Sequence, residues 1–262
     1  MAVKLADIIH QPEGAETKPP LVIAHGLFGS ARNFNTMGRK LAQGRRVALV
    51  DMRNHGDSPW DNSVAYPDMA GDLAQAIQGL GGPAVVLGHS MGGKAAMALA
   101  LEHPDLVAGL IVADIAPITY PHSHLGYIQA MRALDLSGIT RRGEADPMLA
   151  DAIPDAPIRA FILQNLIVEA GAARWRLNLK ALEAGMDTLT GWPDALDSRA
   201  YGGPCLFLKG GASDYVDAAG EARGRMLFPS AEVRAIDGAG HWLHAERPDA
   251  FRHAVEAFLA TL

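Results

Sequence analysis

The sequence predicts an α/β fold with a mainly parallel central sheet, helices on both faces of the sheet and a helical insertion. Short apolar runs without polar alternation, such as residues 21–24 and 47–50, are typical of strands covered on both faces. These runs alternate with segments of helical spacing, which favours parallel strands joined by crossover helices. Between residues 119 and 199 the apolar residues recur at helical spacing, and no strand is indicated there.

The length and composition predict one large domain with an insertion. The chain has 262 residues, 49% of them hydrophobic, which is enough for a full core. We expect an α/β core formed by residues 1–118 and 200–262, and a helical lid formed by residues 119–199 that covers the strand ends. Packing inside the lid is the default for any apolar lid residue, and the candidates for lining a pocket are Met131, Trp175, Leu179, Met186 and Trp192.

Charge and cysteine content exclude several classes of protein. The formal net charge is -6 without long runs of either sign, which argues against nucleic acid as the main partner. Cys205 is the single cysteine, so no internal disulfide is possible, and its apolar surroundings indicate a buried strand residue. The first residues have no apolar signal-peptide region, and no stretch is long enough to span a membrane. We therefore expect a cytoplasmic protein.

The first part of the chain reads as strands and one helix joined by loops. The expected elements are a strand over residues 3–9, a turn over 11–20, strands over 21–24 and 47–50, and a helix over 66–80. The helix is indicated by Met69, Leu73 and Ile77 and is stopped by the glycines at 81 and 82. Residues 51–58 are rich in hydrogen-bonding groups, and we interpret them as a structural loop rather than a catalytic one.

A serine stands at the centre of the next motif, Gly88–Gly92. An apolar run, Ala84–Leu87, predicts a buried strand before it, and the alanine-rich stretch Lys94–Leu101 predicts a helix after it. A Gly-x-Ser-x-Gly pattern at a strand-to-helix corner is a nucleophile elbow, which presents the hydroxyl of Ser90 outside the backbone. A chance match in a chain with 28 glycines is the alternative, and the flanking strand and helix argue against it.

Two backbone amides are candidates for binding an oxyanion. The amide of Met91 begins the helix after Ser90, where unpaired N–H groups and the helix dipole favour negative charge. The Gly-rich loop His25–Ser30 follows the strand over residues 21–24, and its amide at Leu27 is the second candidate. The alternative for this loop is an ordinary turn between a strand and a helix.

The remaining elements follow the serine motif. They are a strand over residues 110–113, a lid helix that starts near Asp155, strands over 205–208 and 232–236, and a final helix over 248–262. The final helix carries Phe251, Val255 and Phe258 on one face. In parallel sheets of this kind, active sites lie at the carboxyl ends of the strands.

The base that activates Ser90 is expected to be a histidine, because imidazole works as a base near neutral pH. Of the 10 histidines, His241 is preferred since it follows the last strand in a Gly-rich loop. His25 is expected to brace the loop around Leu27. Two aspartates could orient the base: Asp214 gives the chain order Ser, Asp, His, and Asp114 ends the strand after the serine helix. A helix N-cap or a loop-bracing carboxylate is the alternative role for either.

The motifs at residues 25–30, 51–56, 88–94, 114–117 and 238–242 resemble those of the α/β-hydrolase superfamily. More narrowly, they resemble its small bacterial acyl-ester and acyl-CoA thioester hydrolases, which are related to a mitochondrial abhydrolase. The resemblance covers essentially the whole chain. It implies a Ser90–His241 pair with an acid after the strand that ends at Asp114. In that branch the position matching Asp214 is often not acidic, which favours Asp114, and both aspartates stay candidates here.

These residues lead us to expect hydrolysis of an ester or thioester through an acyl-enzyme at Ser90, with a small-molecule substrate. No metal or organic cofactor is needed, and the histidines show no ligand cluster. The apolar lid favours an acyl chain of some length. Cofactor-free haloperoxidases and carbon–carbon bond hydrolases use the same triad in the same fold and remain alternatives. A non-catalytic binding module is a third alternative, against which the complete triad argues.

Overall fold

Seven strands form the main sheet of the computed structural model, which describes residues 1–12 and 14–262. In spatial order they are β1 (Asp7–His10), β3 (Val47–Val50), β2 (Leu21–Ala24), β4 (Ala84–His89), β5 (Val107–Ala113), β8 (Cys205–Gly210) and β9 (Ala231–Ile236). The edge strand β1 pairs antiparallel with β3, and the other neighbours pair parallel. The predicted mainly parallel sheet is confirmed.

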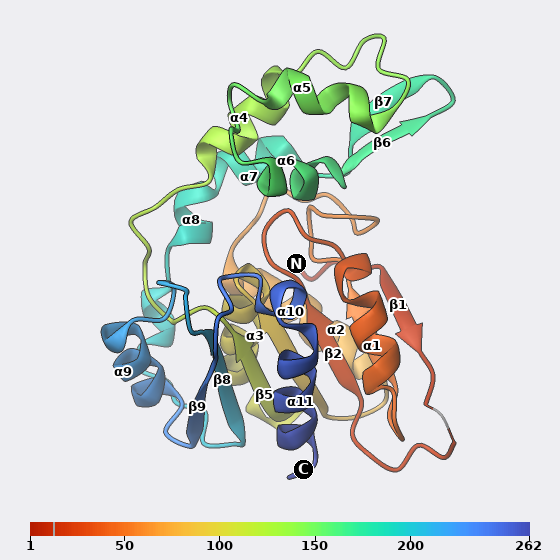
Figure 1. Ribbon diagram of the computed structural model, residues 1–262. Helices are drawn as coiled ribbons and strands as arrows, with labels where there is room; N and C mark the ends of the chain where they lie inside the picture. The colour runs from red at the N-terminus through yellow and green to blue at the C-terminus, as the bar shows by residue number, and fades with distance from the viewer. Residues whose placement is uncertain (13) are drawn as a thin grey trace.

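Helices cover both faces of this sheet, as predicted (Figure 1). One face carries α1 (Asn35–Leu41) and α11 (Pro248–Leu259), and the other carries α2 (Tyr66–Gly79), α3 (Met91–Glu102) and α9 (Ala218–Leu227). The short elements of the core are η1 (Ala31–Phe34), η2 (Pro104–Leu106) and α10 (Leu243–Glu246).

The side chains of β2 explain why the central strands lack polar alternation. Leu21 and Ile23 belong to the same hydrophobic cluster as Phe251 of α11. Val22 points to the opposite face and belongs to the cluster that contains Leu73 of α2. Since successive strand residues face opposite sides and each side is covered by helices, every position of β2 is buried and apolar.

The first strand begins later than expected, at Asp7 instead of residue 3. The amide of Val3 donates to Oδ1 of Asp72 in α2, at 2.6 Å. The residues before β1 therefore run along α2, and their apolar character reflects packing on that helix rather than pairing in the sheet.

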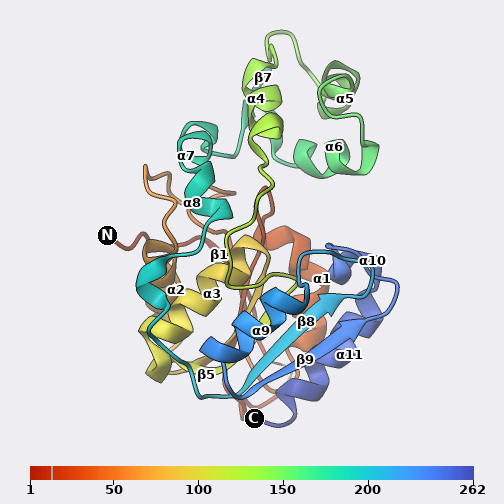
Figure 2. The ribbon, with the colours of Figure 1, turned by 90° about the vertical axis from the view of Figure 1, so that its left-hand side faces the viewer.

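Residues 119–199 lie above the carboxyl ends of the parallel strands (Figure 2). This segment contains α4 (Leu125–Ala133), η3 (Arg142–Glu144), α5 (Ala145–Leu149), α6 (Ala156–Leu163), β6 (Leu166–Glu169), β7 (Ala172–Trp175), α7 (Leu179–Ala184), α8 (Met186–Thr190) and η4 (Asp194–Leu196). Helices make up most of its regular secondary structure.

The expectation that this segment contains no strand is wrong, because β6 and β7 form an antiparallel hairpin. Its two-residue loop consists of Ala170 with φ 51° and Gly171 with φ 79°. Two successive left-handed residues match a type I′ turn, which suits the twist of a tight hairpin. The strands are short and partly exposed, so they carry no long apolar run.

The last lid helix, α8, is anchored to the core by hydrogen bonds to its carboxyl end. Nζ of Lys94 in α3 donates to the carbonyl oxygens of Thr190 at 2.9 Å and Gly191 at 2.6 Å. The hydroxyl of Tyr66 in α2 donates to the carbonyl oxygen of Leu189 at 2.6 Å. A cation beside the last carbonyls of a helix satisfies groups that have no partner within the helix.

Candidate active site

The chain turns sharply at Ser90, between the end of β4 and the start of α3. Ser90 has φ 52° and ψ −118°, a conformation that non-glycine residues rarely adopt. A Cβ at Gly88 would lie 2.2 Å from the carbonyl oxygen of Gly92, and a Cβ at Gly92 would lie 2.5 Å from that of Ala24. The two glycines of the motif therefore allow β4, α3 and β2 to approach closely around the serine.

His241 and Asp114 meet at the carboxyl end of the sheet. Nδ1 of His241 is 2.8 Å from Oδ2 of Asp114, whose side chain is fully buried. The same carboxylate accepts hydrogen bonds from the amide of Gly210 at 2.8 Å and from the hydroxyl of Ser213 at 2.5 Å. Asp114 thus holds the N–H of His241 on Nδ1, which leaves Nε2 free to accept a proton.

The structure does not bring Asp214 to His241 in the same way. Asp214 is exposed, and no hydrogen bond joins it to His241 in the part of the chain that the structure describes. Its neighbour Ser213 instead donates to Asp114. The loop after β8 therefore contributes a donor to the buried carboxylate, while its own carboxylate faces solvent.

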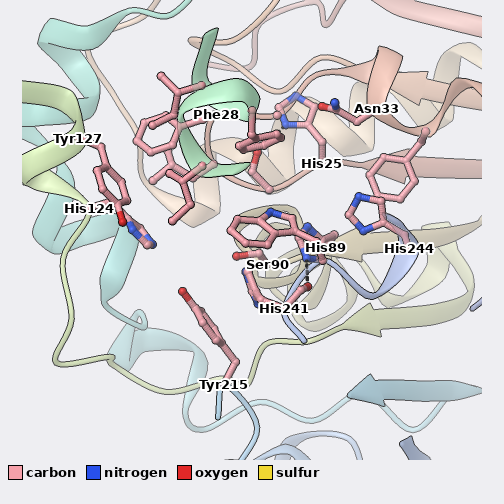
Figure 3. A pocket seen from close by; sticks show the side chains of 18 residues that line it. His25, Phe28, Asn33, His89, Ser90, His124, Tyr127, Tyr215, His241 and His244 are labelled. Carbon is pink, nitrogen blue, oxygen red and sulfur yellow. Dashed lines mark hydrogen bonds between the residues drawn. The ribbon is translucent and has the colours of Figure 1, made fainter. Parts of the chain in front are cut away.

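Ser90 and His241 line the same cavity, although no hydrogen bond between them is present among the described residues (Figure 3). His241 is held from two further sides. Nε2 of His89 donates to its carbonyl oxygen at 2.9 Å, and the ring of Tyr215 stacks on its imidazole with the centroids 3.7 Å apart. Hydrogen bonds between a nucleophile and its base are often long without substrate and tighten in the bound complex.

Leu27 and Met91 line a small cavity together with Ser90. Met91 is the first residue of α3, so its N–H has no acceptor within the helix. Leu27 lies in the loop after β2, which is closed by a hydrogen bond from the amide of Gly29 to the carbonyl oxygen of Gly26 at 2.9 Å. The two residues predicted to supply oxyanion donors therefore line one cavity together with the serine.

Two buried histidines brace the loop around Leu27. Nδ1 of His25 donates to the carbonyl oxygen of Gly26 at 2.8 Å, and its Nε2 accepts from the amide of Met52 at 2.9 Å. His55 accepts at Nε2 from the amide of Phe28, at 3.3 Å. Burial lowers the pKa of His25 to about 4, and burial together with the nearby His25 lowers the pKa of His55 to about 3. Both rings are therefore neutral, and they hold the loop in place through these hydrogen bonds.

A cavity of about 280 Å³ opens beside Ser90 and His241. Figure 3 shows His124 and Tyr127 on one side of it and Asn33 and His244 on the other. Ile158, Phe161 and Ile162 on α6 also line it. None of these residues is among the five candidates for lining a pocket; for the residues of α6, helical spacing shows that they are apolar and not which way they face. Trp242 also lines the cavity, and its position next to His241 in the sequence is the signal that could have identified it as a cavity residue.

Ser90 also lines a second cavity of about 30 Å³. Its walls include Tyr66, Lys94 and Ile115 from the core and Met186 and Leu189 from α8. Lys94 is buried, and the loss of hydration lowers the pKa of its ammonium group to about 7. Its two acceptors are the carbonyl oxygens at the end of α8.

Of the five lid residues considered as pocket residues, Met186 lines a cavity at Ser90. Met131, Trp175 and Leu179 are buried in the hydrophobic cluster that also contains Leu73 of α2, and Nε1 of Trp175 donates to the carbonyl oxygen of Met131 at 3.0 Å. Trp192 packs against that cluster and donates from its indole to Asp197. Across residues 1–12 and 14–262, no three histidine, cysteine or acidic side chains gather as a metal site would require.

The chain matches the model of a protein family described as "Alpha/beta hydrolase family" over residues 21–254. Within the described residues no helix has both the length and the apolar character needed to cross a membrane.

Several known proteins are similar over nearly the full chain. An "sn-1-specific diacylglycerol lipase ABHD11" of Mus musculus is 43% identical over 95% of this chain and 83% of its own length. An "Esterase YbfF" of Escherichia coli (strain K12) is 36% identical over 92% of both chains. A solved structure named "Marine microorganism esterase" has a TM-score of 0.92 and 35% identity, and the match covers 98% of this chain and 100% of that one.

Proposed function

This chain belongs to the alpha/beta hydrolase family and is an ester-hydrolysing enzyme, and we propose that it cleaves carboxylic esters or thioesters through an acyl-enzyme at Ser90. One observation carries the proposal: His241, hydrogen-bonded through Nδ1 to buried Asp114, lines the same cavity as a serine held in a strained elbow. The names of the relatives, an esterase and a lipase, support the same reaction class.

In the first step, Oγ of Ser90 attacks the carbonyl carbon and its proton passes to Nε2 of His241. A bond forms between Oγ and carbon, and the carbonyl oxygen becomes an oxyanion that the amides of Leu27 and Met91 stabilise. Each such donor is worth about 3 kcal/mol in the transition state. Asp114 stabilises the imidazolium that forms and keeps its ring in place.

The tetrahedral intermediate then collapses, and the bond from carbon to the leaving oxygen or sulfur breaks. Nε2 of His241 gives its proton to the leaving group, which departs as an alcohol or thiol. Water enters, gives a proton to His241 and attacks the acyl-enzyme, and the second collapse returns the proton to Ser90 and releases the carboxylic acid. The neutral histidines His25 and His55 hold the Leu27 loop in place throughout.

The proposal is tested by covalent labelling with a fluorophosphonate, followed by mass spectrometry of the peptides. We expect the label on Ser90, and we expect the Ser90→Ala variant to lose both labelling and hydrolysis of 4-nitrophenyl butyrate. Ser230→Ala is a matched control, since Ser230 is an exposed serine whose hydroxyl donates to the carbonyl oxygen of Gly202. Hydrolysis that persists in the Ser90→Ala variant would show that the nucleophile is another group.

A further inference from the structure

Ser90 lines two cavities of very different size, which share Leu27, His124 and Tyr215 as further wall residues. The large cavity measures about 280 Å³ and the small one about 30 Å³. Since a water-sized group needs roughly 10–15 Å³ on this measure, the small cavity has room for about two or three such groups. The large cavity has room for about twenty. A substrate whose carbonyl carbon sits at Ser90 must therefore place a small group on one side and can place a long group on the other.

The position of His241 decides which part of the substrate takes which side. During acylation His241 must reach the leaving oxygen or sulfur, and during deacylation it must reach the attacking water, so both occupy the same place. Of the two cavities, the large one is lined by His241 among the described residues, and the small one is not. The leaving group and then the water must stand on the side of the large cavity. The acyl substituent is left with the small cavity.

We propose that this enzyme selects short acyl groups, from acetyl to about butyryl, carried by a large apolar alcohol or thiol. This inference rests on the proposed acyl-enzyme at Ser90 and deepens it. It reverses the expectation that the apolar lid receives a long acyl chain, because the larger of the two cavities that lid residues line lies on the leaving-group side. The walls of the small cavity that contact the acyl group are the side chains of Ile115, Met186 and Leu189.

The small cavity is prevented from widening by the anchoring of α8. Its wall residues Met186 and Leu189 lie on this helix, and the end of the helix is tied down by Lys94 and Tyr66. The amide of Tyr120 adds a further hydrogen bond to the carbonyl oxygen of Thr190, at 3.0 Å. A longer acyl group would have to displace Met186 and Leu189 against these hydrogen bonds, whereas the large cavity can accept more atoms without moving α8.

The test is a pair of chain-length series with the wild-type enzyme. In the first series, 4-nitrophenyl esters run from acetate to decanoate, and we expect kcat/KM to fall by about tenfold or more between butyrate and octanoate. In the second series, the acyl group is acetyl throughout, and the alcohol part of the ester runs from ethanol to decanol. Here we expect kcat/KM to stay level or to rise with length. The opposite pattern, with long acyl chains preferred and long alcohols rejected, would overturn the assignment.

Leu189→Ala removes atoms from the wall of the small cavity, and we expect it to raise kcat/KM for hexanoate relative to acetate by about tenfold. Leu149→Ala is the matched control, because Leu149 is a buried lid leucine that lines neither cavity. In Leu149→Ala, the ratio of kcat/KM for hexanoate to kcat/KM for acetate should equal that of the wild type. An unchanged ratio in a folded Leu189→Ala variant would overturn the assignment, and the wild-type series test it even where that variant fails to fold.

The two proposals fail in different ways. If the wild type hydrolyses esters, Ser90→Ala does not, and octanoate is preferred to acetate, the acyl-enzyme stands and the short-acyl assignment is wrong. If Ser90→Ala retains hydrolysis, the acyl-enzyme itself is wrong, and the orientation argument falls with it.

Discussion

Asp114 is the residue on which the orientation of His241 depends, because its buried carboxylate accepts three hydrogen bonds at once. In Asp114→Asn an NH2 group replaces one carboxylate oxygen. The resulting amide favours the wrong tautomer of His241 and lacks the negative charge that stabilises the imidazolium. We expect kcat with 4-nitrophenyl butyrate to fall by about 10³- to 10⁴-fold. The exposed Asp214 is the matched control, and Asp214→Asn should stay within about twofold of wild type, a change of under about 0.5 kcal/mol in activation free energy. Equal losses in the two variants would contradict the assignment.

The sequence indicates Ser90 and His241, the proposed nucleophile and base, because each stands in a short Gly-rich pattern after a strand. It does not decide between Asp114 and Asp214, since both follow strand ends. The distinction depends on the sheet order, which places β5 between β4 and β8, and on the loop after β8, whose Ser213 donates to Asp114. Neither feature is encoded in spacing along the chain.

The close approach of α3 to the end of β2 makes Gly92 a structural requirement of the elbow. In Gly92→Ala the new Cβ would lie 2.5 Å from the carbonyl oxygen of Ala24, which is backbone and cannot turn aside. We expect the free energy of unfolding, measured by urea denaturation, to fall by about 2 kcal/mol or more, with a loss of esterase activity as Ser90 shifts.

A matched control is available within the neighbouring helix. A Cβ at Gly71, inside α2, would meet the methyl group of Ala2 at 3.8 Å, an ordinary contact. Gly71→Ala should therefore raise the free energy of unfolding by about 0.5–1 kcal/mol, because alanine has the higher helix propensity. If both substitutions destabilise equally, close packing at Gly92 is not the reason for the glycine.

At the scale of elements, long periodic patterns are predicted well and short irregular ones are not. Strand β4 and helices α2 and α11 occur where apolar runs and helical spacing place them. The hairpin of β6 and β7 is missed because its four-residue strands are only partly buried and its turn residues, Ala170 and Gly171, are not a strong turn pair. Such a hairpin depends on tertiary contacts rather than on its own pattern.

At the scale of the whole molecule, three buried histidines link stability to pH. His25, His55 and His89 are each at most 3% exposed. Burial is the main cause that lowers their pKa values, to about 4 for His25, to about 3 for His55 and well below the usual value for His89. The unfolded chain binds protons at these side chains below about pH 6.5, whereas the folded protein binds them only under stronger acid. Stability is therefore full above pH 6.5 and is lost as the pH falls toward the folded values.

The expected loss is large enough to measure in a pH range where most carboxylates remain ionised. Between pH 7.5 and pH 5.0, a histidine whose pKa is lowered from 6.5 to about 4 or below costs about 2 kcal/mol of stability, so His25 and His55 together cost about 4 kcal/mol. His89 shifts in the same direction and adds to the loss. The loss is a large part of the whole stability of a typical domain, about 5–15 kcal/mol. Urea denaturation at half-unit steps should show the free energy of unfolding falling steadily across this range. A value that is level or rises as the pH falls would mean that these rings are already protonated in the folded protein. In that case His25 and His55 could not accept the amide hydrogens of Met52 and Phe28, and the bracing of the Leu27 loop would need another explanation.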